Sequence, residues 1–297
     1  MQSSKQPNRG GVVRHAFRLA NMGKARAWAR RTHGCGACLA LSLALLSACA
    51  PASSPSSVTS LTDSNLASSI TALAVNPSGA LVCIAGGRAY RLENLKTWSA
   101  LPSPTSASSA AWREGNWWLA LPSAGLIYKA TGVPQSISVI GSPALLTSRF
   151  AFTTSGEVLD FSGASVGRVG ALPSVTLETT GTTFALVGRV VYAIDRSVER
   201  RQMLETGMDS LVSLNDELQV LPGLAARASG FTYRLEGREL TARNSAERVI
   251  AKVTIDFKVS KIIASSDWVA VTAAGSLSIY RAPDLSPVLT SNCGGGR

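Results

Sequence analysis

Histidine is scarce in this sequence. The only two, His15 and His33, both lie within the first 33 of 297 residues. The rest of the chain lacks the imidazole that acts as general base in Ser-His-Asp and Cys-His catalysis and that commonly ligates zinc. These classes of site are therefore excluded for residues 34–297. The chain also carries no Asp-x-Asp-x-Asp calcium loop and no Gly-x-Gly-x-x-Gly phosphate loop, so we expect neither a metal nor a cofactor.

Acidic residues are absent from the first 62 positions. Eight of the 29 Lys and Arg precede Cys49, whereas all 18 Asp and Glu follow it. The formal net charge of +11 for the whole chain is therefore only +3 from Cys49 onward. Because the basic character belongs to the N-terminal segment, the remainder gives no reason to expect a nucleic-acid partner.

Long hydrophobic runs are also lacking. The apolar stretch from Cys38 to Ala48 has about half of the roughly 20 residues that a membrane-spanning helix needs. Arg30 and Arg31 lie shortly upstream, and the stretch ends in Leu46-Ser47-Ala48-Cys49. A basic segment, an apolar segment and small residues at a cleavage point are typical of an export signal. The last four residues resemble the lipobox of bacterial lipoproteins.

This resemblance implies that residues 1–48 are a signal peptide and that Cys49 becomes the acylated first residue. Several acyl chains give stable membrane anchoring where a single chain does not. Ala50 stands where Asp would retain such a protein in the inner membrane, so we expect the outer membrane if there is one. Translation from Met22 would give the signal an ordinary length. The alternative is a secreted protein that is cut nearby.

A Ser-rich segment, residues 49–69, follows and is typical of a flexible tether. As a coil it would reach about 25 Å from the lipid. Two further cysteines remain, Cys83 and Cys293. An exported protein permits a disulfide between them, although Cys83 lies in an apolar strand pattern where a lone cysteine is commonly a small core residue.

Beyond Ile70 the chain shows short β-type runs that recur in the same order. The first unit comprises Ile70–Val75, Leu81–Ala85, Arg88–Leu92 and Thr97–Leu101, separated by turn residues. Equivalent third-strand positions are 31 to 48 residues apart, at Tyr90, Tyr128, Phe161, Tyr192, Leu240 and Tyr280. This spacing is close to the period of about 40 residues in propeller blades.

We therefore predict an all-β fold: a β-propeller of about six four-stranded blades over residues 70–292, with a flexible tail at 293–297. Radial stacking would bury both faces of each sheet. The segment Ser210–Leu224 predicts either an added hairpin or a reduced seventh blade. A β-sandwich is the rival fold, but it would not need a four-strand period. Val190–Asp195 resembles the third strand of quinoprotein propeller repeats, without the turn and Trp that follow there.

The residues Trp112, Arg113, Trp117, Arg149 and Asp267 form our predicted binding patch. Tryptophan provides a large amphipathic contact area and is enriched in recognition sites. The adjacent Trp117 and Trp118 must point to opposite faces of a strand, so at least one of them belongs to the core.

Acidic turn residues allow a second interpretation. Glu114, Glu178 and Asp267 fall in first-to-second-strand turns and could act as paired carboxylates in a polysaccharide hydrolase or lyase. With no catalytic motif present, we favour a non-catalytic, membrane-anchored platform of the cell envelope that binds a protein or glycan partner.

Overall fold

The computed structural model describes residues 70–205, 207–273 and 275–294. The predicted signal peptide, Cys49 and the tether lie outside the described residues. The described part is almost entirely β-structure, with a short 3-10 helix, η2 (Pro122–Ala124). Within it, no helix has the length and apolarity needed to cross a membrane.

Six sheets have four strands each, paired antiparallel in chain order. Blade 1 comprises β1 (Ile70–Val75), β2 (Leu81–Ala85), β3 (Arg88–Glu93) and β4 (Thr97–Ala100). Blade 2 comprises β5 (Ser109–Arg113), β6 (Asn116–Leu121), β7 (Leu126–Lys129) and β8 (Gln135–Ser138). Blade 3 comprises β9 (Pro143–Leu146), β10 (Phe150–Thr153), β11 (Glu157–Asp160) and β12 (Ser165–Arg168). Blade 4 comprises β13 (Val175–Glu178), β14 (Thr183–Val187), β15 (Val190–Ile194) and β16 (Val198–Met203). Blade 6 comprises β19 (Ala225–Ala228), β20 (Phe231–Glu236), β21 (Glu239–Arg243) and β22 (Val249–Thr254). Blade 7 comprises β23 (Lys261–Ala264), β24 (Trp268–Thr272), β25 (Leu277–Arg281) and β26 (Pro287–Ser291).

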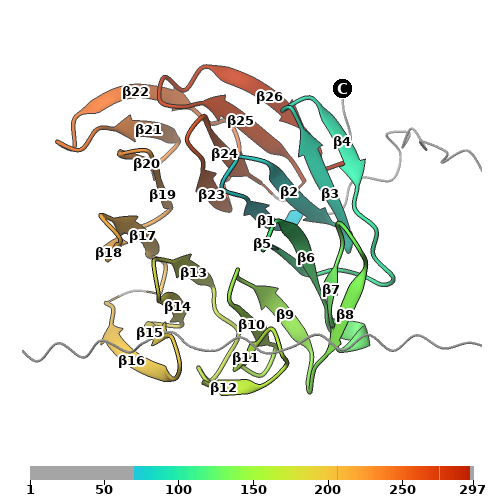
Figure 1. The fold of residues 1–297 in the computed structure, drawn as a ribbon. Coiled ribbons are helices and arrows are strands. Elements are labelled where there is room, and N and C mark those ends of the chain that lie inside the picture. Colours follow the sequence, from blue (N-terminus) through green and yellow to red (C-terminus); the bar gives the residue numbers. More distant parts are fainter. Residues whose placement is uncertain (1–69, 206, 274, 295–297) are drawn as a thin grey trace, which may run out of the picture. The chain divides into compact units, whose positions relative to one another are not determined.

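The sheets stand around a central axis with the first strand of each blade innermost (Figure 1). The predicted propeller is confirmed, and the β-sandwich interpretation is wrong. The strands of blade 1 match the first predicted unit closely, because the turn residues Pro77-Ser78-Gly79 and Gly86-Gly87 separate its apolar runs. Gly79, Gly86 and Gly87 all have positive φ values of 57° to 79°, a backbone region that favours glycine.

The segment that the sequence left open forms a reduced blade 5. It has two strands, β17 (Ser210–Leu214) and β18 (Glu217–Leu221). In the inner ring β17 lies between β13 and β19 (Figure 1), the position that the first strand of any other blade occupies. The segment is therefore a seventh blade without its two outer strands, not a hairpin added to another sheet.

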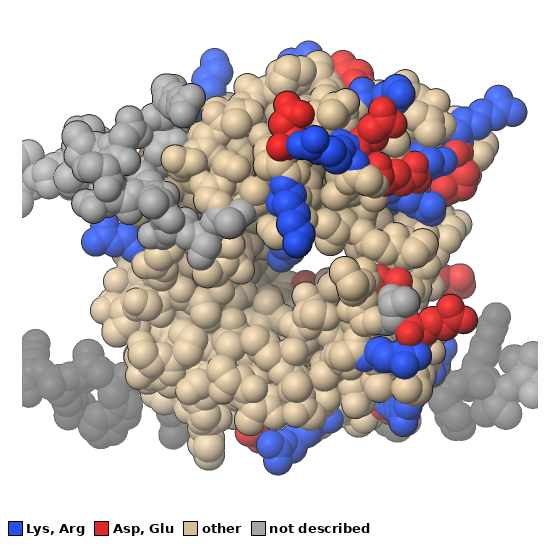
Figure 2. Space-filling view, turned by 180° about the vertical axis from the view of Figure 1, so that it is seen from behind, with Lys and Arg blue, Asp and Glu red and all other residues tan. Residues whose placement is uncertain are grey.

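The charged face of blade 6 explains why the neighbouring blade 5 can lack its two outer strands. Its apolar residues, such as Tyr233 and Leu240, pack toward blade 7. Strand alternation therefore places Arg234, Arg243 and Lys252 on the opposite face, toward blade 5. These three side chains form ion pairs with Glu247, Glu236 and Glu239 at 3.4, 2.7 and 3.1 Å, and charged side chains gather over this blade in Figure 2 (upper right). A charged face of this kind is suited to water, so it needs no covering strands.

The core of the molecule lies between successive blades rather than inside one sheet. Along β2, Leu81 and Cys83 pack against blade 7, while Val82 and Ile84 pack against blade 2. All four side chains are 0% exposed. A continuous apolar run, instead of an apolar and polar alternation, is expected for a strand that is buried on both faces.

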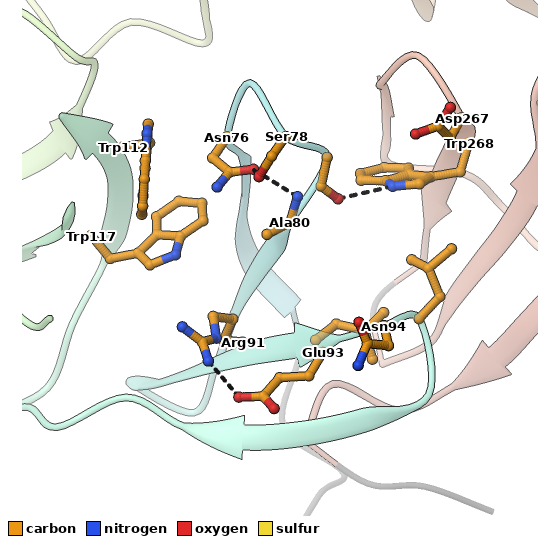
Figure 3. A pocket seen from close by; sticks show the side chains of 13 residues that line it. Asn76, Ser78, Ala80, Arg91, Glu93, Asn94, Trp112, Trp117, Asp267 and Trp268 are labelled. Carbon is orange, nitrogen blue, oxygen red and sulfur yellow. Dashed lines mark hydrogen bonds and ion pairs between the residues drawn. The ribbon is translucent and has the colours of Figure 1, made fainter. Parts of the chain in front are cut away.

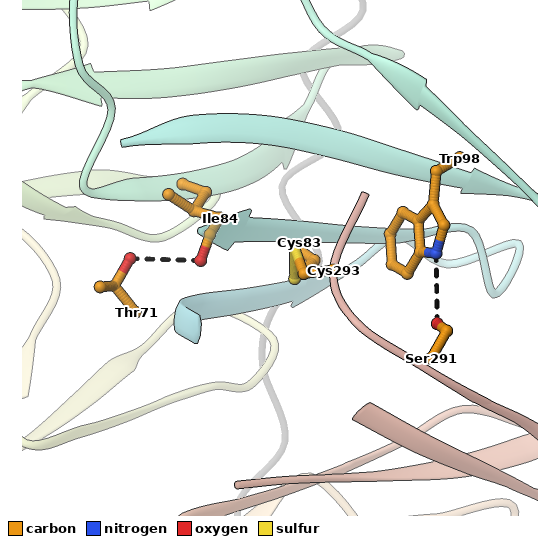
Figure 4. Close-up of a disulfide and its surroundings, with 6 residues drawn as sticks. All are labelled: Thr71, Cys83, Ile84, Trp98, Ser291 and Cys293. Atoms are coloured by element: carbon orange, nitrogen blue, oxygen red, sulfur yellow. Dashed lines mark hydrogen bonds between the residues drawn. A yellow bond between two sulfur atoms is a disulfide. The ribbon is translucent and has the colours of Figure 1, made fainter. Parts of the chain in front are cut away.

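Among the strands of residues 70–294 that the structure describes, none is exchanged between blades 1 and 7, since each sheet is made from consecutive strands. Side chains close the ring instead. Cys83 in β2 and Cys293 after β26 form a disulfide with a Cα–Cα distance of 6.0 Å, and Trp98 Nε1 donates to Ser291 Oγ at 3.3 Å (Figure 4). The predicted tail 293–297 thus begins with two packed residues, because Cys293 and Gly294 are both buried.

Candidate functional site

One mouth of the ring, here called the turn mouth, carries the turns that join first and second strands. A pocket of about 510 Å³ opens there between blades 7, 1 and 2. The β1–β2 turn around Asn76, the strands β5 and β6 with Trp112 and Trp117, and the β23–β24 turn with Asp267 all line it (Figure 3). The β3–β4 turn of blade 1 completes the lining. We call this the Trp112 pocket.

Two tryptophans form one wall of the pocket. Trp112 and Trp117 are directly opposite on neighbouring strands, so both project from the same face of blade 2. Their rings meet edge to face, with centroids 5.2 Å apart and an interplanar angle of 67°. Trp117 is 1% exposed, whereas Trp112 is half-buried. Trp112 is therefore held by a core residue and still offers accessible aromatic surface.

The adjacent Trp118 projects from the opposite face, as strand alternation predicted. It is 5% exposed and packs edge to face on Phe161, at 5.4 Å between ring centroids. Trp118 belongs to the contact between blades 2 and 3 and has no part in the pocket.

Polar groups form much of the remaining wall, and several of them already have hydrogen-bond partners. Asn76 Oδ1 accepts hydrogen bonds from the hydroxyl of Ser78 at 2.9 Å and from the backbone N–H of Ala80 at 2.7 Å. Arg91 donates to Glu93 at 2.5 Å. This bond, together with a hydrogen bond from Ser99, holds the pKa of Glu93 below its ordinary value, so Glu93 is a carboxylate at neutral pH.

The β23–β24 turn supplies one bound and one unbound side chain. Trp268 Nε1 donates to the carbonyl oxygen of Gly79 at 2.9 Å and fixes the β1–β2 turn. Asp267 is exposed, and its carboxylate has no ion-pair or hydrogen-bond partner among the described residues. Its backbone is held, because its N–H donates to Ser265 Oγ and its carbonyl accepts from Ala282.

Of the five predicted patch residues, Trp112, Trp117 and Asp267 lie together in the pocket, while Arg113 and Arg149 do not line it. Arg113 donates to the carbonyl of Ser148 at 3.0 Å, and its guanidinium lies 4.4 Å from the Phe161 ring centroid. It thereby connects blade 2 to blade 3.

Arg149 makes the equivalent connection one blade further on. It donates to the carbonyl of Thr179 at 2.6 Å, and its Nε lies 3.9 Å from Glu178 Oε1. Glu178 in turn accepts from the backbone N–H and the hydroxyl of Ser148, at 2.9 and 2.8 Å. Thr180 continues the series by donating its N–H to Asp216 in blade 5, at 2.8 Å. Side chains of the turn mouth thus bind successive blades together.

Sequence reasoning missed the pocket residues Asn76, Arg91, Glu93, Asn94 and Trp268. Asn-Pro-Ser-Gly at 76–79 is a turn signal that places Asn76 at the same mouth, and it was available. The sequence could not predict that β3 and the β3–β4 turn line the pocket, because this depends on how blade 1 packs against its neighbours in three dimensions.

The three carboxylates of the enzyme interpretation occupy different places. Asp267 lines the Trp112 pocket. Glu178 lines the central channel. Glu114 occupies the β5–β6 turn and pairs with Arg113 at 2.6 Å. Within the described ranges, no group of three acidic, Cys or His side chains is arranged to hold a metal ion.

Two acidic residues of third-to-fourth-strand turns cap those turns. Asp160 Oδ1 accepts from the backbone N–H groups of Ser162 and Ala164, at 2.8 and 3.0 Å. Asp284 Oδ1 accepts from the N–H and the hydroxyl of Ser286, at 3.0 and 2.9 Å. These bonds lower the pKa of Asp284.

The central channel is a second cavity, of about 470 Å³, lined by inner strands. Its charged groups are Glu178, Arg227 and Lys261. Arg227 donates to Thr232 Oγ1 at 3.1 Å. Lys261 is exposed to the channel. The channel lacks the aromatic surface of the Trp112 pocket.

No protein-family model and no curated protein matches the chain. Among solved structures, it is similar to virginiamycin B lyase from Staphylococcus aureus, with a TM-score of 0.54 and 10% identity over 70% of this chain and 92% of the lyase. A chain of a nidogen/laminin complex has a TM-score of 0.49 and 11% identity, and the match covers 72% of this chain and 93% of that chain. PorZ is a surface component of the type-IX secretion system of Porphyromonas gingivalis. It has a TM-score of 0.48 and 12% identity, and the match covers 77% of this chain and 39% of PorZ. At these identities the likeness to the lyase shows the propeller fold alone.

Proposed function

We propose that this protein is a lipoprotein of the bacterial cell envelope whose propeller binds a protein or glycan partner without catalysing a reaction. Its anchor would be the acylated Cys49, on the extracytoplasmic side and in the outer membrane where one exists. Residues 49–69 would hold the propeller off the lipid surface.

The observation that carries the binding role is the Trp112 pocket. It combines a half-buried Trp112, a carboxylate at Asp267 that has no partner in the described part of the chain, and a volume of about 510 Å³. This volume lies in the range of ligand sites, which are typically concave and combine aromatic surface with a few polar groups. The lining residues come from three blades, with the polar ones in blades 1 and 7 and Trp112 and Trp117 in blade 2. Because these blades pack on one another, the site is held in shape before a ligand arrives.

The enzyme alternative has one observation in its favour, since Asp267 and Glu93 line the same pocket. A paired mechanism needs one carboxyl group that is protonated and able to donate. Glu93 is ion-paired with Arg91 and its pKa is lowered, so it could serve only as the ionised partner. The donor role would fall to Asp267, which is exposed and for which the pocket supplies no burial. The arrangement therefore favours binding over hydrolysis.

The anchor is tested by expressing the full chain and Cys49→Ala in a bacterial host with labelled palmitate. The wild-type chain is expected to incorporate label and to fractionate with membranes, and Cys49→Ala to do neither. Ser47→Thr, which leaves the cysteine in place, is the control for expression. Label-free wild-type protein, or membrane retention of Cys49→Ala, would contradict the anchor.

The binding role is tested by affinity capture from envelope extract with detergent-solubilised full-length protein, followed by identification of the retained proteins and glycans. Trp112→Ala should lose the partner, and Val133→Ala, a change at a residue 79% exposed outside the pocket, should keep it. A partner retained equally by both variants would show that the pocket is not the binding site. If nothing is retained, the platform function is wrong.

A further inference from the structure

We propose that the Trp112 pocket binds one uncharged pyranose unit of a glycan, with the sugar ring stacked on Trp112. This assignment rests on the proposed binding function and names the class of ligand that the site takes. Three properties of the pocket support it: its accessible aromatic surface, its mixture of donors and acceptors, and its charge.

The aromatic surface has the form of a platform. Trp117 and Trp268 are 1% and 2% exposed, so their faces are used within the protein. Trp112 is the half-buried member of the three, and Trp117 fixes its orientation at 67°. Trp112 therefore supplies the accessible indole surface of the pocket, and the face of an indole ring suits the flat C–H face of a pyranose. A cage for a quaternary ammonium group would need several rings facing the same centre.

The polar lining matches the needs of hydroxyl groups. Each sugar hydroxyl donates one hydrogen bond and accepts others, so a binding site needs both kinds of partner. Arg91 offers only donors, Glu93 and Asp267 offer only acceptors, and the Asn94 amide offers both. Planar side chains of this type can bind two neighbouring hydroxyls at once.

Charge separates this ligand from two others. Among the charged lining residues, Arg91 is cationic, and Glu93 and Asp267 are anionic, so the pocket carries a net charge of −1. That excess disfavours uronic acids and sulfated or phosphorylated sugars. Arg91 lies beside Glu93 at 2.5 Å and neutralises it, so the excess charge is that of Asp267 alone. Asp267 is exposed, and water and salt screen its attraction for a lysine or choline headgroup. A neutral ring is the ligand that this balance favours.

The test is a titration of full-length, detergent-solubilised protein with a panel of neutral oligosaccharides. The panel includes cellotriose, maltotriose and triacetylchitotriose, with trigalacturonate as the charged comparison, and binding is followed by calorimetry and tryptophan fluorescence. At least one neutral trisaccharide is expected to saturate the protein, and trigalacturonate to bind at least about tenfold more weakly.

Two variants report on the pocket. Trp112→Ala is expected to weaken binding at least about tenfold, as truncation of an aromatic anchor does, while Trp112→Phe keeps most of it. Asp267→Asn changes an exposed side chain, so the fold is retained, and the variant should bind severalfold more weakly. Trp98→Phe removes a tryptophan outside the pocket and should leave both affinity and signal change unaltered.

Failure of this proposal can be told apart from failure of the platform function. If no neutral oligosaccharide saturates the protein, or if Trp112→Ala binds it as the wild type does, the sugar assignment is overturned. Capture of a protein partner in the preceding experiment would then leave the platform function standing. Tighter binding of trigalacturonate than of every neutral trisaccharide would also contradict the proposal.

Discussion

The indole Nε1 of Trp268 donates a 2.9 Å hydrogen bond to the carbonyl oxygen of Gly79, although the two residues are 189 positions apart. The bond joins the last blade to the first at the turn mouth. The Cys83–Cys293 disulfide joins the same two blades (Figure 4). Side-chain contacts therefore provide the closure that a shared strand would otherwise give to a ring.

Replacing Trp268 by Phe should destabilise the ring and disturb the pocket beside it. The variant keeps an aromatic ring but removes the hydrogen bond to the half-buried Gly79 carbonyl, which contributes about 0.5–1.5 kcal/mol. It also leaves a cavity where the larger, buried indole stood. We expect an unfolding free energy lower by about 2 kcal/mol, measured by urea denaturation with fluorescence and circular dichroism.

Trp98→Phe is the matched control for Trp268→Phe. Trp98 Nε1 lies 3.3 Å from the hydroxyl of Ser291, which can rotate toward another partner or water. Its loss should cost less than about 1 kcal/mol. Equal losses for the two variants would contradict the closing role of the Trp268 bond.

Removing the disulfide should lower stability more than either tryptophan change. Cys83 and Cys293 are separated by 210 positions, and cross-linking a loop of that length restricts the unfolded chain strongly. We expect Cys83→Ala combined with Cys293→Ala to lose about 2–5 kcal/mol. Denaturation of wild-type protein with and without a reductant checks this, because only the wild type should respond to reduction.

Alanine substitutions at two glycines of blade 3 allow the cost of backbone strain to be measured separately from the cost of a steric clash. Gly156 and Gly170 have φ values of +76° and +89°, so alanine is strained at both positions. A Cβ on Gly156 would lie 2.3 Å from the backbone nitrogen of Ala171, whereas a Cβ on Gly170 would meet nothing within 4 Å.

Gly170→Ala should therefore cost about 1–2 kcal/mol, the strain of a left-handed residue. Gly156→Ala should cost at least about 2 kcal/mol more, because overpacking forces the backbone to move. Thermal unfolding of the two variants measures the difference. Equal melting temperatures would mean that the two chain segments are not in close contact.

The sequence predicted most of the fold, because blade architecture is written locally. The runs at Ile70–Val75 and Leu81–Ala85 became β1 and β2 without change. The number of blades was harder to predict. Whether Ser210–Leu224 forms a blade of the ring depends on the contacts of β17 with β13 and β19, and no local sequence pattern indicates them. The sequence of blade 6 did indicate a reduced neighbour, because Arg234 and Arg243 occupy strand positions that a four-stranded blade 5 would have covered.

The candidate site was predictable only in part for a similar reason. Tryptophans and acidic turn residues are visible in a sequence, and three of them share one pocket. The hydrogen-bond partners of Arg113 and Arg149 could not be predicted from the sequence, because each arginine binds a backbone carbonyl about 30 or more positions away. An exposed arginine in a turn looks the same in sequence whether it awaits a ligand or holds the next blade.

Tyr233 in β20 makes stability sensitive to alkaline pH. Its side chain is 0% exposed, its hydroxyl has no hydrogen-bond partner among the described residues, and desolvation raises its pKa to about 12. The unfolded chain ionises this phenol near pH 10. Between those values the unfolded state binds fewer protons than the folded state, so unfolding becomes more favourable as pH rises.

Tyr233→Phe should remove this sensitivity. At neutral pH the variant should be as stable as the wild type or more so, because it loses a buried hydroxyl that makes no protein contact. The difference in its favour should grow from pH 10 to pH 12, by on the order of 2 kcal/mol for a shift of this size. Urea denaturation of both proteins at several pH values measures that growth, and Tyr280, present in both, cancels. A difference independent of pH would show that the Tyr233 hydroxyl reaches water in the folded protein.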